Sequence, residues 1–153
     1  MTAKTVKTQT SSAEETRRLG AKLAETASPG DVFSLNGDLG SGKTEFVRGF
    51  VEALASDALV HSPTFSIVNT YPAPDFPIHH FDFYRIEDVR EFAAIGLDEY
   101  INGDGVCLVE WGEMYPEVLP DTAKRIKFTE IDEVTRSIEM FFSSIPPSKS
   151  PPP

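Results

Sequence analysis

The sequence predicts an α/β fold, a three-layer sandwich around a mixed sheet with a mainly parallel centre and an antiparallel margin. Segments typical of strands alternate along the chain with segments of helical periodicity. The run GVCLVEW, residues 105–111, is almost continuously apolar, as expected of a central parallel strand with both faces covered. Two later strand-like segments, Arg125 to Phe128 and Ser137 to Phe142, are expected to close the sheet.

The first third of the chain predicts a helix, a strand and a second helix. Ser12 and Glu15 form a capping box, and apolar residues then recur at helical spacing, which predicts a helix over residues 12–27. A proline and a glycine end this helix, and VFSLN, residues 32–36, is typical of a short buried strand. Residues 44–54 place their apolar side chains on one helical stripe. A glycine-rich loop therefore joins a strand directly to a helix.

The middle of the chain predicts two more strands and a short helix. Residues 64–71 alternate in polarity and are rich in β-branched and aromatic residues, which favours a half-buried strand. Residues 77–86 form a second strand candidate, and residues 87–96 predict a short helix.

Composition predicts one folded domain over residues 11–143. With 153 residues and 40% hydrophobic content, the chain is long enough to bury a single core. Residues 1–10 are polar and are expected to be a flexible N-terminus. Residues 144–153 are rich in proline and are expected to form a disordered tail, because proline lacks a backbone donor.

Charge, cysteine content and hydropathy narrow the function classes. A formal net charge of −10 argues against a protein that grips nucleic acid alone, and it suits either solubility or docking onto a basic partner. The single cysteine, Cys107, excludes an intrachain disulfide and favours a reducing compartment. No apolar run is long enough to span a membrane, so we expect a cytoplasmic protein. We also expect the free protein to be a monomer.

Residues 37–44, hereafter the phosphate loop, match the pattern G-x-x-x-x-G-K-[ST] between a predicted strand and a predicted helix. Glycines allow successive backbone N–H groups to turn toward phosphate oxygens, and the helix N-terminus adds partial positive charge. Lys43 is expected to reach the β and γ phosphates, and the Thr44 hydroxyl is expected to bind Mg²⁺. The pattern therefore predicts a nucleoside triphosphate ligand in a P-loop NTPase-like fold.

Two carboxylates are candidates for the chemistry beside this loop. Glu110 ends the apolar run, at the carboxyl end of a presumed core strand where open α/β sheets bind ligands. Asp82 lies inside a strand-like segment, where an acid is unusual. Thr64 follows a Ser-Pro pair and is either part of a turn or close to the γ-phosphate. His79 and His80 are adjacent in a strand, so they point to opposite faces and are interpreted as structural or partner-facing.

Four segments resemble the TsaE (also called YjeE) family of bacterial proteins in the tRNA threonylcarbamoyladenosine pathway. These are GDLGSGKTEF, SPTFSIVNTY, HHFDFYR and LVEWGE, in the family's order and spacing over residues 32–113. The chain departs from the family where glycine follows Trp111, a position often taken by proline, and in its proline-rich tail.

The resemblance implies a small ATPase that binds ATP and Mg²⁺ and acts with the partner proteins TsaB and TsaD on tRNA, which those partners hold. It assigns Lys43, Asp82 and Glu110 to catalysis, and Thr44 and Glu110 to Mg²⁺. The residues expected to contact the nucleotide are Gly37, Asp38, Leu39, Gly40, Ser41, Gly42, Lys43, Thr44, Glu45, Thr64 and Trp111.

Three other functions are weighed against this one. A GTPase should contain N-K-x-D and D-x-x-G motifs, and the sequence contains neither. A small-molecule phosphotransferase would transfer phosphate to an acceptor other than water. A non-catalytic binding module gated by nucleotide would bind ATP without turnover. The last two remain alternatives.

Overall fold

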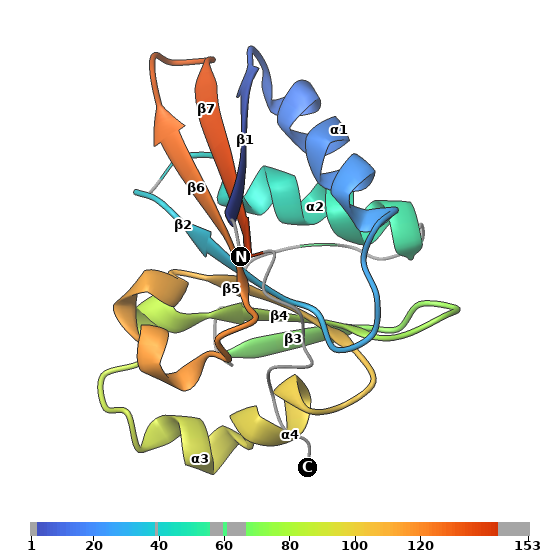
Figure 1. The fold of residues 1–153 in the computed structure, drawn as a ribbon, viewed down its shortest axis with the longest axis vertical. Helices are drawn as coiled ribbons and strands as arrows, with labels where there is room; N and C mark the ends of the chain where they lie inside the picture. Colours follow the sequence, from blue (N-terminus) through green and yellow to red (C-terminus); the bar gives the residue numbers. More distant parts are fainter. Residues whose placement is uncertain (1–2, 39, 56–59, 61–66, 144–153) are drawn as a thin grey trace.

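A seven-stranded mixed sheet organises the computed structural model, which describes residues 3–38, 40–55, 60 and 67–143 (Figure 1). The strand order is β1-β7-β6-β2-β5-β4-β3. The strands are β1 (Ala3–Thr10), β2 (Val32–Asn36), β3 (Val68–Tyr71), β4 (Ile78–Asp82), β5 (Val106–Glu110), β6 (Lys124–Glu130) and β7 (Arg136–Ser143).

The centre of the sheet is parallel and its margins are antiparallel, which confirms the predicted fold class. The parallel pairs are β4 with β5, β5 with β2 and β2 with β6. The antiparallel pairs are β1 with β7, β6 with β7 and β3 with β4. The carboxyl ends of β2, β4 and β5 consequently lie at one edge of the sheet.

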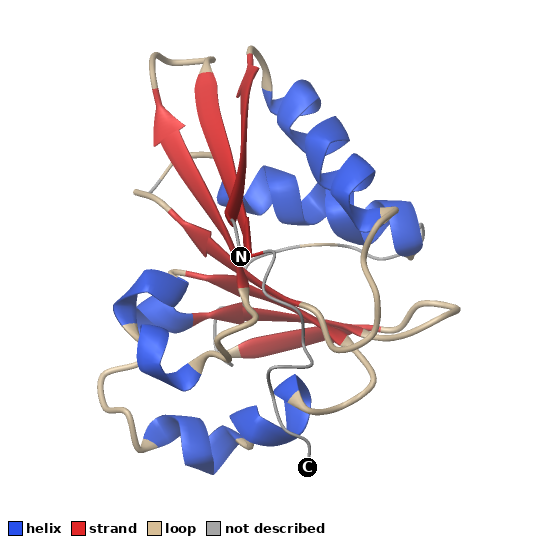
Figure 2. Ribbon diagram, in the orientation of Figure 1, coloured by secondary structure: helices blue, strands red, loops and turns tan. Residues whose placement is uncertain are grey.

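Helices cover the two faces of the sheet (Figure 2). One apolar cluster joins α1 and α2 to the sheet, and a second joins α3 and the start of α4 to the other side. Along β5, Val106 and Leu108 belong to the first cluster and Cys107 and Val109 to the second, which explains the unbroken apolar run. The helices are α1 (Ala13–Ala24), α2 (Lys43–Leu54), α3 (Glu91–Ile95) and α4 (Leu97–Ile101), with short 3₁₀ turns η1 (Phe83–Arg85), η2 (Gly112–Met114) and η3 (Pro116–Val118).

The N-terminal segment differs from the prediction. Residues 3–10 form the edge strand β1, paired along its whole length with β7, where a flexible N-terminus was expected. The segment has no alternating apolar pattern, but it contains Thr5, Thr8 and Thr10 and one valine, all of which favour β-structure. Backbone hydrogen bonds to β7 hold this segment in place, and such bonds leave no apolar pattern in the sequence.

Several predicted elements are shorter than expected. Helix α1 ends at Ala24, three residues early, and α3 begins at Glu91, four residues late. Strand β4 ends at Asp82, where the chain turns into η1. Helix α4 was not predicted; it is separated from α3 by Gly96, whose φ is 75°. Strand β3 begins at Val68, and the expected tail from residue 144 onward lies outside the described residues.

Candidate functional site

The phosphate loop joins the end of β2 to the start of α2, as predicted. Strand β2 lies between β5 and β6 in the sheet. The φ angles of Gly37, Gly40 and Gly42 are 147°, 78° and 105°, a region that residues with side chains seldom adopt. The glycine pattern is therefore explained by the backbone shape that the loop must hold.

The loop combines glycine backbone with a buried hydroxyl in a way that suits an anionic ligand. A Cβ atom at Gly37 would lie 2.6 Å from the backbone oxygen of Phe128, so no side chain fits there. The Ser41 hydroxyl is buried and has no hydrogen-bond partner within the described part of the chain. Gly42, the N-cap of the twelve-residue helix α2, provides no side-chain cap. These groups fit a phosphate, which accepts hydrogen bonds from hydroxyl and backbone donors.

Lys43, the first residue of α2, is almost fully buried at 4% exposure. Its ammonium donates to the backbone oxygen of Gly37, and Nζ lies 3.5 Å from the centre of the Trp111 ring. Burial lowers the pKa of Lys43, and the charge of Glu110 is the largest of the effects that oppose this change. A buried cation of this kind is stabilised by an anionic ligand.

Asp82 and Glu110 end the neighbouring strands β4 and β5 and are paired in register. Burial, together with the charge of Glu110, raises the pKa of Asp82, while the backbone N–H of Tyr84 donates to its Oδ1 at 3.0 Å and lowers it. Glu110 is 5% exposed. The structure thus places both predicted carboxylates at the edge of the sheet that carries the phosphate loop.

These side chains line one cleft of about 460 Å³, hereafter the Lys43 cleft. It brings together most of the predicted site residues with residues from α1 and the β6–β7 hairpin. Its lining is Ser12, Ala13, Thr16, Gly40, Ser41, Gly42, Lys43, Thr44, Glu45, Asp82, Glu110, Trp111, Glu133, Val134 and Arg136. Leu39 and Thr64 lie outside the described residues.

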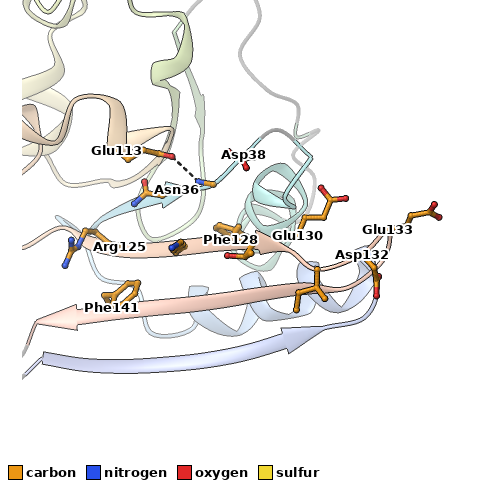
Figure 3. A pocket seen from close by; sticks show the side chains of 13 residues that line it. Asn36, Asp38, Glu113, Arg125, Phe128, Glu130, Asp132, Glu133 and Phe141 are labelled. Atoms are coloured by element: carbon orange, nitrogen blue, oxygen red, sulfur yellow. Dashed lines mark hydrogen bonds between the residues drawn. The ribbon is translucent and has the colours of Figure 1, made fainter.

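Gly37 and Asp38 line a larger neighbouring groove of about 1120 Å³ across β6 and β7 (Figure 3). Carboxylates gather along it, and Glu113 accepts the Gly37 N–H at 3.1 Å. The groove also contains Arg125 and Lys127, but the loop lysine and the buried Ser41 hydroxyl both line the smaller Lys43 cleft, which makes that cleft the better candidate for a phosphate group.

Glu45, expected to contact the nucleotide, has its carboxylate engaged elsewhere. Its Oε1 lies 3.0 Å from Nε of Arg17 on α1 and 3.6 Å from Nε of Arg48. Although Glu45 also lines the Lys43 cleft, its pair with Arg17 links α1 to α2, and its pair with Arg48 lies within α2.

His80 and Arg136 also contact residues of the site, although neither was predicted to belong to it. His80 Nε2 lies 2.6 Å from Glu110 Oε2, and the Arg136 guanidinium donates to the backbone oxygen of Gly40 at 3.0 Å. His80 precedes Asp82 by two residues on one strand, so the two share a face, and that alternation was a usable signal. Arg136 is almost a hundred residues from the loop, and no local pattern reveals its position.

The protein side chains in the cleft would bind Mg²⁺ only together with ligand atoms such as phosphate oxygens. Within the described ranges, no group of three or more His, Cys, Asp and Glu side chains is arranged to hold a metal ion by itself. Mg²⁺ is usually bound by one or two protein ligands together with phosphates and water. Thr44 and Glu110, which both line the Lys43 cleft, provide a hydroxyl and a carboxylate of this type.

Among the helices that the structure describes, none combines the length and the apolar character needed to cross a bilayer.

Comparisons with known proteins give a consistent result. Residues 10–138 match the family described as threonylcarbamoyl adenosine biosynthesis protein TsaE. Two relatives are named tRNA threonylcarbamoyladenosine biosynthesis protein TsaE. The one from Bacillus subtilis is 44% identical, and the match covers 88% of this chain and 84% of the relative. The one from Haemophilus influenzae is 35% identical, and the match covers 80% of each chain. A crystal structure of Bacillus subtilis YdiB is similar, with a TM-score of 0.79 and 37% identity over 93% of this chain and 88% of that one. These comparisons confirm the resemblance drawn from the four sequence segments, and the chain belongs to the TsaE family.

Proposed function

We propose that this protein is the ATP-binding and ATP-hydrolysing member of the machinery that makes threonylcarbamoyladenosine in tRNA. The names of its relatives support the pathway. We further propose that it acts with TsaB and TsaD, which hold the tRNA, because a chain with a net charge of −10 is poorly suited to bind RNA alone.

The observation that carries this proposal is the buried Lys43 ammonium between the phosphate loop and two strand-end carboxylates. A cation that is removed from water and close to Glu110 and Asp82 prepares the cleft for a charged ligand that also brings a metal. ATP with Mg²⁺ has both properties.

Each residue would then have a defined task. The Lys43 ammonium and the loop N–H groups would stabilise charge on the phosphates as the γ-phosphate is attacked. Thr44 and Glu110 would hold Mg²⁺, which neutralises charge on phosphate oxygens. Asp82 would orient the attacking water, and Trp111 would exclude other water from the ammonium side of the cleft. Hydrolysis would reset the conformation of the complex.

The test is ATP hydrolysis by the wild type and Asp82→Ala, each with and without TsaB and TsaD. We expect turnover to be highest for the wild type with both partners and to fall at least tenfold in Asp82→Ala, because loss of a positioned acid or base typically costs 10²–10⁴-fold.

Equal rates under all four conditions would contradict the catalytic assignment. Tight ATP binding by the wild type without turnover, even with both partners present, would favour a nucleotide-gated binding module. Transfer of the γ-phosphate to an acceptor other than water would favour a phosphotransferase.

A further inference from the structure

His80 is a fully buried polar side chain that the proposed mechanism does not use. It lies on β4, has 0% exposure, and its ring stacks on Tyr71 with the centroids 6.5 Å apart. Its Nε2 lies 2.6 Å from Oε2 of Glu110, on the neighbouring parallel strand β5. This short contact connects the interior of the sheet to a carboxylate of the Lys43 cleft.

The surroundings of the ring determine which nitrogen donates. Nδ1 is buried and has no hydrogen-bond partner among the described residues. A proton on Nδ1 would be a buried N–H without an acceptor, which is more costly than an unpaired lone pair there. We therefore assign the proton to Nε2, which donates to Glu110.

This hydrogen bond fixes one of the two carboxylate oxygens of Glu110. Because Glu110 lines the Lys43 cleft, the other oxygen is the one that a ligand in the cleft would meet. Residues that hold a metal ligand by hydrogen bonding set its orientation, and losing one typically weakens metal binding 10- to 100-fold.

We propose that His80 is a positioning residue, which holds the Glu110 carboxylate in the orientation that binds Mg²⁺ with the nucleotide. This inference rests on the proposed function, since it requires a metal–nucleotide ligand in the Lys43 cleft. Pure packing is the competing explanation, because an apolar ring of similar size would fill the space beside Tyr71 equally well.

The neighbouring His79 offers a matched control. It lies on the same strand but faces the other way, with Nδ1 2.9 Å from Thr70 Oγ1 and its ring 4.7 Å from the ring of Tyr100. It does not line the Lys43 cleft. The same substitution at positions 79 and 80 thus separates loss of a histidine from loss of the contact with Glu110.

The experiment titrates Mg²⁺ into each protein saturated with the non-hydrolysable analogue AMPPNP, and also measures AMPPNP binding in EDTA. The fluorescence of Trp111, the chain's single tryptophan, provides the signal because its ring lies against Lys43. We expect His80→Phe to raise the apparent Kd for Mg²⁺ at least tenfold. His80→Gln, whose amide can replace the Nε2 donor, should stay within about threefold of the wild type, and His79→Phe should be unchanged. All variants should bind AMPPNP equally in EDTA.

Two results separate failure of this inference from failure of the proposed function. A wild type that shows no Mg²⁺ response overturns both. If the wild type responds to Mg²⁺ and His80→Phe has the same apparent Kd for Mg²⁺, only the positioning role is overturned. The same conclusion follows if His80→Phe loses AMPPNP affinity equally in EDTA and in Mg²⁺. If thermal denaturation shows that His80→Phe does not fold, His80→Asn replaces it, because its amide is too short to reach Glu110.

Discussion

Gly37 shows how one hydrogen atom in place of a side chain decides the shape of the phosphate loop. A Cβ atom there would lie 2.6 Å from the backbone oxygen of Phe128 and 2.9 Å from Ser41 Oγ. The backbone oxygen belongs to β6, an inner strand of the sheet, and cannot easily move. The loop can therefore begin beside the sheet only with glycine at this position.

Gly37→Ala is expected to destabilise the fold and to weaken nucleotide binding. The overlap with β6 adds about 1–3 kcal/mol to the conformational strain. Gly40→Ala is the matched control, because its φ of 78° is also unfavourable but a Cβ atom there meets nothing within 4 Å. Urea unfolding should place Gly37→Ala below Gly40→Ala in unfolding free energy. Equal stability of the two variants would show that the overlap with β6 does not destabilise the fold.

Asp82→Asn is expected to stabilise the protein at neutral pH. Burial raises the pKa of Asp82 in the folded state, so between the unfolded and folded pKa values the folded state binds more protons. Stability from this group is therefore present at low pH and is lost as the pH rises through the folded pKa. An asparagine has no charge to desolvate, and it can still accept the Tyr84 N–H.

The measurement is urea unfolding of wild type and Asp82→Asn at pH 7 and at about pH 4. The variant should be more stable at pH 7, and the difference should shrink at the lower pH as Asp82 takes up its proton. A variant that is less stable than wild type at pH 7 would contradict the burial argument.

At the residue scale, the sequence identifies the residues with local signals. Lys43 follows from the glycine motif, and Glu110 follows from its place at the end of an apolar strand. His80 was interpreted only as structural or partner-facing, since a histidine in a strand has many ordinary roles until its partner is known. Its contact with Glu110 joins residues thirty positions apart.

At the scale of elements, α1 and α2 cross at two glycines. A Cβ atom at Gly49 would lie 1.8 Å from the backbone oxygen of Arg17, and one at Gly20 would lie 2.1 Å from that of Phe46. The backbones approach so closely that no side chain fits between them. This crossing fixes the helix that begins with Lys43 against its neighbour.

Gly49→Ala is expected to lower the unfolding free energy by about 2 kcal/mol. Alanine favours a helix interior over glycine by about 1 kcal/mol, but overpacking costs about 1–3 kcal/mol. The upper end of this range applies here, because the added Cβ atom would overlap main-chain atoms that cannot easily move. Glu52→Ala, at an exposed position of the same helix, should change stability by no more than about 0.5 kcal/mol. If chemical denaturation gives Gly49→Ala an unfolding free energy equal to or above that of the wild type, this would argue against the close crossing.

Arg136 ties the β6–β7 hairpin to the phosphate loop. Its guanidinium donates to the backbone oxygens of Asp132 and Thr135 in the hairpin and to that of Gly40 in the loop. Because the side chain is partly exposed, we expect its removal to weaken the free energy of ATP binding by only about 1 kcal/mol.

Arg136→Gln should accordingly weaken ATP binding about fivefold in calorimetry. Arg18→Gln removes an equally charged side chain from an exposed pair with Glu14 on α1, and it should leave the affinity unchanged. If both variants bind like wild type, the hairpin does not support the loop.

Among the elements, β5 and β1 mark the limits of sequence-based prediction. Strand β5 was predicted because both of its faces are buried and its apolar run is unbroken. Strand β1 was missed because it lies at the edge of the sheet, and a single row of backbone hydrogen bonds leaves no apolar pattern. Helix α4 is only five residues long, which is too short for periodicity to appear.

In the whole molecule, the parallel order β4-β5-β2 assembles the site. It brings the carboxyl ends of three strands from separate parts of the chain to one edge, and it places Asp82 and Glu110 beside the helix that begins with Lys43. The fold class could be predicted because strands and helices alternate. The contributions of Ser12 and Arg136 to the same cleft could not, since they depend on how the sheet margin pairs.

Isothermal titration calorimetry of ATP with Mg²⁺, for wild type and Lys43→Ala, tests the central claim most directly. A charged hydrogen-bond donor contributes about 1.5–3 kcal/mol, so the variant should bind about ten- to hundredfold more weakly while keeping its fold by circular dichroism. Equal affinity of the two proteins would contradict the account, because ATP would then not depend on the ammonium group in the Lys43 cleft.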